Sequence, residues 1–310
     1  MKIVFWGTSS FALPTLEKIA RSKEEILLVV TQPDKKQGRH LKLIPPPVKI
    51  KAEELNLKVV QPDSLSDKNF LSSLKELEPD LFVVVAYGNI LKREILQIPR
   101  IISLNLHASL LPKYRGPAPI NWAIWKGEKE TGVSIIKMNE KMDAGEIILQ
   151  KKIPISEEDN ALSLGERLSR EGADLCKEAI DLLAQGKAKF LPQEESKASF
   201  APLLKKEDGK IDWRNSAREI SRQIRALLPW PGSYCFYKQK LLKIWKASAG
   251  EEDFSGFSPG EIVEIGKEEF AVATGKGKLW IKELQLAGGR RMSAREFLSG
   301  HPLQKGEIWQ

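Results

Sequence analysis

Residues 1–31, MKIVFWGTSSFALPTLEKIARSKEEILLVVT, contain the pattern that decides the fold class. Two apolar runs rich in β-branched residues, Lys2–Trp6 and Glu25–Thr31, flank Phe11–Arg21, whose apolar residues recur at helical spacing. The order strand, helix, strand predicts two parallel strands joined by a crossover helix. The same alternation predicts further strands at Lys58–Val60, Asp80–Ala86 and Ile102–Leu106, and further helices at Pro47–Leu55 and Asp67–Glu78. The first 155 residues therefore predict an α/β fold with a doubly wound, mostly parallel sheet.

The pattern changes in the second half of the chain. Gly132–Asn139 and Ile147–Ile155 are predicted strands around the turn Asp143-Ala144-Gly145, and Ala161–Ala184 is the longest predicted helix. Weak periodicity predicts a linker at 189–210, between an α/β domain at 1–188 and a second domain at 211–310. After the helix Ser216–Leu227, five short strands predict a small OB-like β-barrel. These strands are Tyr234–Tyr237, Leu241–Trp245, Glu261–Ile265, Phe270–Thr274 and Leu279–Leu286.

Composition excludes several classes of protein. With 42% apolar residues in 310, both domains can bury a core, and with 29% charged residues no run approaches the ~18 apolar residues of a membrane span. The N-terminus lacks the features of a signal peptide, so we expect a cytoplasmic protein. Cys176 and Cys235 are far apart in the sequence and predict neither a disulfide framework nor a zinc site, and we expect both to be buried or inert.

The net charge of +8 is compatible with a polyanionic partner such as RNA, although many basic proteins bind none. The C-terminal part is the more basic per residue. Its tryptophans, Trp213, Trp230, Trp245 and Trp280, are predicted to belong to the core rather than to a stacking surface.

Polar side chains occur at the end of the predicted strand Ile102–Leu106, the position where ligands bind in open parallel sheets. Asn105 and His107 are two residues apart, so they lie on one face of an extended segment. Such a pair can also merely satisfy buried backbone groups, and Asp143 can be a plain turn residue. The next residues, 109–119, are rich in Pro and Gly and predict a defined loop over this position.

These motifs together resemble one enzyme family. Asn105-x-His107, the segment Ser109–Pro112, Arg115-Gly116-x-Ala118-Pro119 and Asp143 are similar to the formyltransferases that use 10-formyltetrahydrofolate. Within that family the chain resembles, over essentially its whole length, the enzymes that act on methionyl-tRNA. The resemblance implies transfer of the formyl group of 10-formyltetrahydrofolate to the α-amino group of methionyl initiator tRNA, with a monomer as the expected working unit and no metal.

The resemblance also implies roles for particular residues. Asn105, His107 and Asp143 form the implied catalytic trio: the Asn105 amide and a His107 N–H stabilise an oxyanion, and Asp143 orients His107 and helps to accept a proton. The implied folate-binding residues are Ser109, Leu110, Leu111, Pro112, Ala86, Tyr87 and Gly88. Gly7 is followed by no further glycine of a G-x-G-x-x-G motif, so a dinucleotide cofactor is not expected.

A basic segment is the first candidate for tRNA contact. Six Lys or Arg residues and no carboxylate lie between Asp34 and Glu53. Its Arg39 and Lys42, and Lys206 in the predicted linker, are the tRNA-binding residues that the resemblance implies. Arg290, Arg291 and Arg295 in the second domain are further candidates for phosphate contact.

Two alternatives remain. A formyltransferase of this type can act on a nucleotide-sugar amine instead of a tRNA. A non-catalytic RNA-binding protein is the alternative of another class, and the presence of all three trio residues argues against it.

Overall fold

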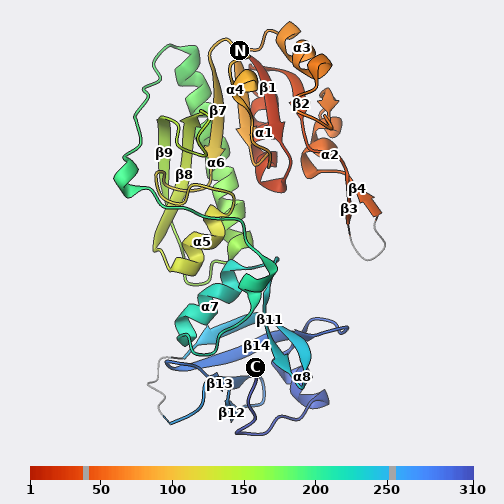
Figure 1. The fold of residues 1–310 in the computed structure, drawn as a ribbon, viewed down its shortest axis with the longest axis vertical. Helices are drawn as coiled ribbons and strands as arrows, with labels where there is room; N and C mark the ends of the chain where they lie inside the picture. The colour runs from red at the N-terminus through yellow and green to blue at the C-terminus, as the bar shows by residue number, and fades with distance from the viewer. Residues whose placement is uncertain (38–41, 251–255) are drawn as a thin grey trace. The chain divides into compact units, whose positions relative to one another are not determined.

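A computed structural model describes residues 1–37, 42–250 and 256–310 of the chain (Figure 1). These residues form two compact units. The N-terminal unit comprises Met1–Pro119, Glu130–Pro154 and Gly165–Pro202, and the C-terminal unit comprises Ile120–Lys129, Ile155–Leu164 and Leu203–Gln310. Each unit contains segments that are distant in sequence, so neither is a single uninterrupted stretch of chain.

The N-terminal unit is built on a seven-stranded sheet of order β5-β2-β1-β6-β7-β8-β9. Its strands are β1 (Lys2–Gly7), β2 (Glu25–Val30), β5 (Val59–Val60), β6 (Leu81–Val85), β7 (Ile102–His107), β8 (Glu130–Lys137) and β9 (Ile147–Pro154). The first five are parallel to one another, whereas β8 pairs antiparallel with β7 and β9 pairs antiparallel with β8. The predicted doubly wound, mostly parallel sheet is confirmed, and its strands begin and end within about two residues of the predicted bounds.

Helices cover both faces of this sheet. They are α1 (Leu13–Ala20), α2 (Pro47–Glu54), α3 (Lys68–Glu76), α4 (Arg93–Leu96) and α6 (Ala161–Ala184). On one face, Trp6 and Phe82 pack in a cluster with Leu74 of α3 and Ile95 of α4. On the other face α6 approaches β7 so closely that a Cβ at Gly172 would lie 2.8 Å from the Leu106 side chain. A larger residue at 172 would separate the helix from the sheet.

A two-stranded hairpin, β3 (Lys35–Gln37) with β4 (Lys42–Ile44), lies beside the seven-stranded sheet without joining it (Figure 1). The sequence analysis predicts only a basic loop there. All three β4 residues are exposed, so this strand has no buried apolar face whose pattern would predict it from the sequence. Two of the lysines in this basic segment are ion-paired: Lys49 with Asp34, and Lys51 with Glu17 and Glu54.

The C-terminal unit contains an antiparallel sheet of order β10-β11-β14-β13-β12, with β15 paired to β14. Its strands are β10 (Ser233–Tyr237), β11 (Lys240–Ala249), β12 (Ile262–Ile265), β13 (Phe270–Ala273), β14 (Lys278–Leu286) and β15 (Met292–Ser293). Its helices are α5 (Pro119–Lys126, from Ile120 on), α7 (Ala217–Ala226) and α8 (Ala294–Gly300), of which only α7 is predicted from the sequence. A C-terminal β domain is thereby confirmed.

The last residues of the chain connect the two edge strands of this sheet. Phe236 of β10 exchanges two backbone hydrogen bonds with Gln310, at 2.6 and 3.3 Å, and Ile262 of β12 donates one to the carbonyl of Glu307 at 2.8 Å. These bonds satisfy edge groups that water would otherwise have to solvate. They are consistent with the OB-like barrel, whose full closure stays a prediction.

The aromatic core of the C-terminal unit includes Trp213 and Trp309, at 5% and 2% exposure. Trp230 is 55% exposed, so the prediction that it belongs to the core is wrong; it lies between two prolines, where the chain has no regular face to bury. Trp245 and Trp280 are half-buried, and cationic side chains of Lys243, Arg291 and Lys278 cover their rings.

Both cysteines are buried, as predicted, and burial raises the pKa of Cys176 to about 12 and also raises the pKa of Cys235.

In the described part of the chain no helix is long and apolar enough to cross a membrane.

Candidate active site

Two polar side chains stand at the end of β7. Asn105 pairs in register with Val84 of β6, and His107 is the last residue of β7. Asn105 and His107 therefore both occur at the carboxyl edge of the parallel part of the sheet. The apolar residues of β7, Leu104 and Leu106, are buried and fix the register of the strand, because a shift of one residue would turn them to the opposite face. The hydrophobic pattern therefore determines where the two polar groups lie.

The third polar group comes from the loop between β8 and β9. Asp143 has a φ of 48°, in the left-handed region that Asp tolerates better than most residues. Two residues later the loop returns so close to β8 that a Cβ at Gly145 would lie 1.7 Å from the carbonyl oxygen of Lys137. Only glycine permits this approach. The turn chemistry of residues 143–145 thus brings the carboxylate of Asp143 back over the sheet edge.

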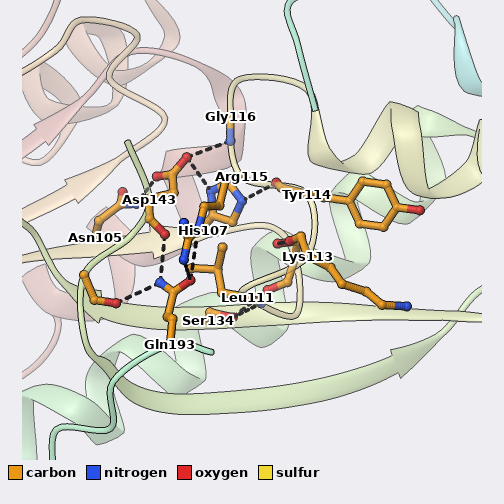
Figure 2. A network of polar contacts seen from close by, with 12 residues as sticks. Asn105, His107, Leu111, Lys113, Tyr114, Arg115, Gly116, Ser134, Asp143 and Gln193 are labelled. Carbon is orange, nitrogen blue, oxygen red and sulfur yellow. Dashed lines mark hydrogen bonds and ion pairs between the residues drawn. The ribbon is translucent and has the colours of Figure 1, made fainter. Parts of the chain in front are cut away.

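The Asp143 side chain contacts both of the other two side chains (Figure 2). Asp143 Oδ2 lies 3.5 Å from Nδ1 of His107, and Asp143 Oδ1 accepts a hydrogen bond of 3.4 Å from Nδ2 of Asn105. The backbone N–H of Gly116 donates to Asp143 Oδ2 at 2.8 Å. The His107 and Asp143 side chains are 7% and 17% exposed, so water screens their interaction only in part. The structure therefore brings together all three residues of the predicted catalytic trio.

The partners of His107 determine where its protons lie. Nε2 is 2.9 Å from the carbonyl oxygen of Tyr114, which can only accept, so Nε2 carries a proton. Nδ1 faces a carboxylate oxygen, and a proton on Nδ1 makes that contact attractive. His107 is thus placed to donate a hydrogen bond from Nε2 while Nδ1 faces the carboxylate.

The loop after β7 is fixed by its own polar groups. Ser109, fully buried, donates from Oγ to the carbonyl of Lys113 at 2.6 Å. Ser134 of β8 donates to the Ser109 carbonyl at 2.6 Å and accepts from the N–H of Leu111 at 3.1 Å. The bond between Leu111 and Pro112 is cis. The hydrogen bonds of Ser109 and Ser134 hold the loop beside the trio, as the Pro and Gly content predicts.

The predicted folate-binding residues occur on two neighbouring segments at this sheet edge. Ala86-Tyr87-Gly88 follows β6, and Ser109–Pro112 follows β7, the strand that pairs with β6. Ala86 and Gly88 are exposed, whereas the Tyr87 ring is buried edge-on against Trp6, and burial raises the pKa of its hydroxyl. The Ser109 and Leu111 side chains are also buried. On these segments, exposed backbone and the half-buried Leu110 and Pro112 remain open to a ligand.

Two groups beside the trio, Arg115 and Gln193, were given no role from the sequence, although Arg115 belongs to a motif of the resemblance. Arg115, 4% exposed, donates from Nε and Nη2 to Oε1 of Gln193 at 3.0 and 2.8 Å. The carboxamide nitrogen of Gln193 donates to the carbonyls of Asp143 and Gly145, each at 2.8 Å. Gln193 belongs to the predicted linker, and its stretch of weak periodicity contains no local signal of this role. Leu191 nearby exchanges backbone hydrogen bonds with Ile147 of β9.

The predicted tRNA-binding residues are partly described. Arg39 lies outside the described residues. Lys42, at the start of β4, and Lys206, in a 3₁₀ turn at Lys206–Gly209, are exposed. The three candidate arginines near the end of the second domain each contact a carboxylate: Arg290 with Glu296, Arg291 with Glu283 and Arg295 with Glu268. A phosphate would have to compete with these carboxylates.

Within residues 1–37, 42–250 and 256–310, no group of three or more His, Cys, Asp or Glu side chains is placed to hold a metal ion. His301, the third histidine of the sequence, stacks on Phe297 in the C-terminal unit at 4.6 Å between ring centroids. The candidate site therefore consists of the Asn105, His107 and Asp143 side chains with their backbone partners.

The fold and this site define the class of protein. Residues 1–180 match the family model described as formyl transferase, and residues 203–302 match the one described as formyl transferase, C-terminal domain. The two matches together cover most of the chain, and the chain belongs to the formyltransferase family.

Curated relatives specify the branch of the family. The chain is 45% identical over 308 residues to the methionyl-tRNA formyltransferase of Pelotomaculum thermopropionicum, covering 99% of this chain and 98% of that protein. It is 44% identical over 307 residues to the methionyl-tRNA formyltransferase of Geobacter sulfurreducens, covering 99% and 96%. The chain is a member of the methionyl-tRNA formyltransferases, which confirms the resemblance stated from the sequence.

Solved structures share the fold at lower identity. The sugar 3N-formyl transferase WlaRD, crystallised in the presence of dTDP and 5-N-formyl-THF, is 24% identical with a TM-score of 0.68, and the match covers 94% of this chain and 99% of that one. HypX from Aquifex aeolicus in complex with tetrahydrofolic acid is 19% identical with a TM-score of 0.63, and the match covers all of this chain and 50% of that one. At these identities the likeness concerns the fold alone.

Proposed function

We propose that this chain transfers the formyl group of 10-formyltetrahydrofolate to the α-amino group of methionyl initiator tRNA. The observation that carries the proposal is the contact of Asp143 with both His107 and Asn105 at the carboxyl edge of the sheet. Family membership gives the reaction type, and this contact gives residues that can perform it.

The reaction requires the protein to stabilise a negative charge and to accept a proton. When the amine attacks the formyl carbon, negative charge develops on the formyl oxygen, and the amine nitrogen must lose a proton. The Asn105 amide is placed to donate to the oxygen. In this proposal the Nε2–H of His107 also donates to it, and the oxygen then takes the place of the Tyr114 carbonyl as acceptor.

Asp143 has two roles in the proposal. Its carboxylate lies 3.5 Å from Nδ1 of His107 and orients the ring, so that the Nε2–H can point to the oxygen. It is also the nearest carboxylate that can accept the amine proton, directly or through a water molecule. As the C–N bond to the acceptor forms, the bond from the formyl carbon to N10 of the folate breaks, and N10 takes up a proton as tetrahydrofolate leaves.

The residues beside the trio fit a reduced folate. A flat heteroaromatic ring needs apolar walls with polar groups at one end. The partly exposed Leu110 and Pro112 offer apolar surface, and the exposed residues Ala86 and Gly88 offer backbone polar groups, at the same sheet edge as His107. We assign Ser109 and Leu111, whose side chains are buried, to shaping the loop rather than to side-chain contact with the ligand.

The tRNA is proposed to bind through phosphate contacts. Lys42 and Lys206 are exposed cations, and Arg39 belongs to the same basic segment as Lys42. Such contacts position the nucleic acid without reading its bases. We propose further that the OB-like domain adds to tRNA affinity, that 189–210 links it to the catalytic domain, and that the enzyme works as a cytoplasmic monomer.

The test is a formylation assay with purified protein, 10-formyltetrahydrofolate and initiator tRNA charged with methionine. The expected product is a blocked α-amine on the methionyl-tRNA. Parallel reactions contain the same tRNA without methionine, the same tRNA charged with another amino acid, and a dTDP-amino sugar. Formylation of the sugar but not of methionyl-tRNA would establish the nucleotide-sugar alternative, and tRNA binding without any formyl transfer would establish the RNA-binding alternative.

A further inference from the structure

One side chain from a distant segment, Gln193, forms hydrogen bonds with the loop that contains Asp143. The carboxamide nitrogen of Gln193 donates to the carbonyl of Asp143 and to the carbonyl of Gly145, both at 2.8 Å. These two carbonyls flank the turn at which the chain adopts the left-handed conformation of Asp143. A single amide therefore ties both ends of the turn together (Figure 2).

The orientation of this amide is itself fixed. Its oxygen, Oε1, accepts from Nε and Nη2 of Arg115 at 3.0 and 2.8 Å. Arg115 is 4% exposed, so these bonds lie in a region of low dielectric where they are strong. With the oxygen held by a guanidinium, the nitrogen of Gln193 can only point towards the two carbonyls.

Arg115 also connects this contact with the loop that approaches the trio from the other side. The next residue, Gly116, donates its N–H to Asp143 Oδ2 at 2.8 Å, and the carbonyl of the preceding residue, Tyr114, accepts from His107. The backbone of Arg115 pairs with residues 199 and 201. The backbone groups that bind the Asp143 carboxylate and the His107 ring thus belong to the two neighbours of Arg115, the residue that Gln193 binds.

We infer that Gln193 is a positioning residue of the active site: by clamping the 143–145 turn to Arg115, it sets the direction in which the Asp143 carboxylate faces His107. This inference rests on the proposed function for its catalytic consequence. Gln193 touches no reacting atom in the proposal. Its effect is on geometry, and displacements on the order of 1 Å at a catalytic group can cost about 100-fold in rate.

The critical variant is Gln193→Glu. It keeps the shape of the side chain and its acceptor for Arg115, so the buried guanidinium retains its partner. It replaces the donating nitrogen by a second oxygen, which repels the carbonyls of Asp143 and Gly145. We expect kcat to fall about 10- to 100-fold, while KM for 10-formyltetrahydrofolate and for methionyl-tRNA stays within about twofold.

Glu195→Gln is the matched control. Glu195 also binds Arg115, at 2.9 Å, but from the solvent side, and its side chain is 71% exposed. Removing that charge leaves the clamp intact, so kcat should stay within about twofold of the starting protein. Gln193→Met, which has similar length and no donor, serves as a second variant if Gln193→Glu does not fold.

A readout without activity separates this inference from the proposed function. The amide of Gly116 should be slow to exchange its hydrogen because it is bonded to Asp143 Oδ2. Exchange should accelerate in Gln193→Glu and not in Glu195→Gln. Unchanged Gly116 exchange would refute the inference even if the chain is a formyltransferase, and so would a kcat equal to that of the control. If the unmodified chain forms no formyl product, the proposed function fails, and the exchange measurement still decides the role of Gln193.

Discussion

The sharpest test of the candidate mechanism is the substitution Asp143→Asn. The amide keeps an oxygen that can accept from the N–H of Gly116, so the loop retains that backbone contact. It removes the negative charge that lies 3.5 Å from Nδ1 of His107. The change keeps the shape of the side chain and removes both its charge and the oxygen that accepts from Asn105.

The magnitude follows from this distance. Two opposite charges 3.5 Å apart attract by about 5 kcal/mol at an effective dielectric constant of ~20. Part of that attraction is offset by the cost of removing the charges from water, and the side chains are 7% and 17% exposed. We expect roughly 3–4 kcal/mol of transition-state stabilisation to be lost, which corresponds to a decrease of about 100- to 1,000-fold in kcat.

The assay is single-turnover formylation of methionyl-tRNA at saturating 10-formyltetrahydrofolate, with circular dichroism to verify folding. Glu146→Gln is the control, because Glu146 lies in the same loop and its weak ion pair with Lys137, at 3.7 Å, faces solvent. It should retain activity within about threefold. If Asp143→Asn turned over as fast as this control, the carboxylate would have no part in the reaction.

Three further predictions concern other parts of the molecule. Asn105→Ala should lower kcat about 100- to 1,000-fold with the same melting temperature, because it removes a donor to the oxyanion; steady-state kinetics with thermal melting checks this, and normal turnover would exclude Asn105 from the site. Lys206→Ala should reduce by about one unit the slope of the logarithm of tRNA affinity against the logarithm of salt concentration, and an unaltered slope in binding titrations would contradict phosphate contact at Lys206. Trp309→Ala should destabilise the C-terminal unit by about 3–5 kcal/mol in urea unfolding, because Trp309 is 2% exposed and packs edge-on against Phe270. Trp230→Ala should cost less than ~1 kcal/mol, because Trp230 is 55% exposed. Equal effects of the two substitutions would refute the assignment of Trp309 to the core.

Where hydrophobic periodicity was strong, the sequence predicted the fold well. The run Asp80–Ala86 was expected as a strand, and β6 spans Leu81–Val85, since five consecutive buried residues leave few alternatives. The helix at Ala161–Ala184 has the predicted bounds. The β3–β4 hairpin and α5 were not predicted, because neither segment contains the alternation or the length by which a strand or helix is recognised.

For the candidate site, the residue types were accessible from the sequence and the contacts were not. The resemblance selected Asn105, His107 and Asp143, and strand register explains why the first two share an edge. Nothing local indicated that the Tyr114 carbonyl would fix a proton on His107 Nε2. That contact depends on a loop conformation with a φ of 59° at Tyr114, which residues of the surrounding loop impose.

The strands of the seven-stranded sheet, the family and the three polar side chains were predictable from the sequence, because apolar spacing and short motifs are properties of neighbouring residues. The hydrogen bond from Gln193 to the carbonyl of Asp143, fifty positions earlier, is visible only in the tertiary structure. A hydrogen bond between residues so far apart depends on how the whole chain packs. No pattern of neighbouring residues encodes it.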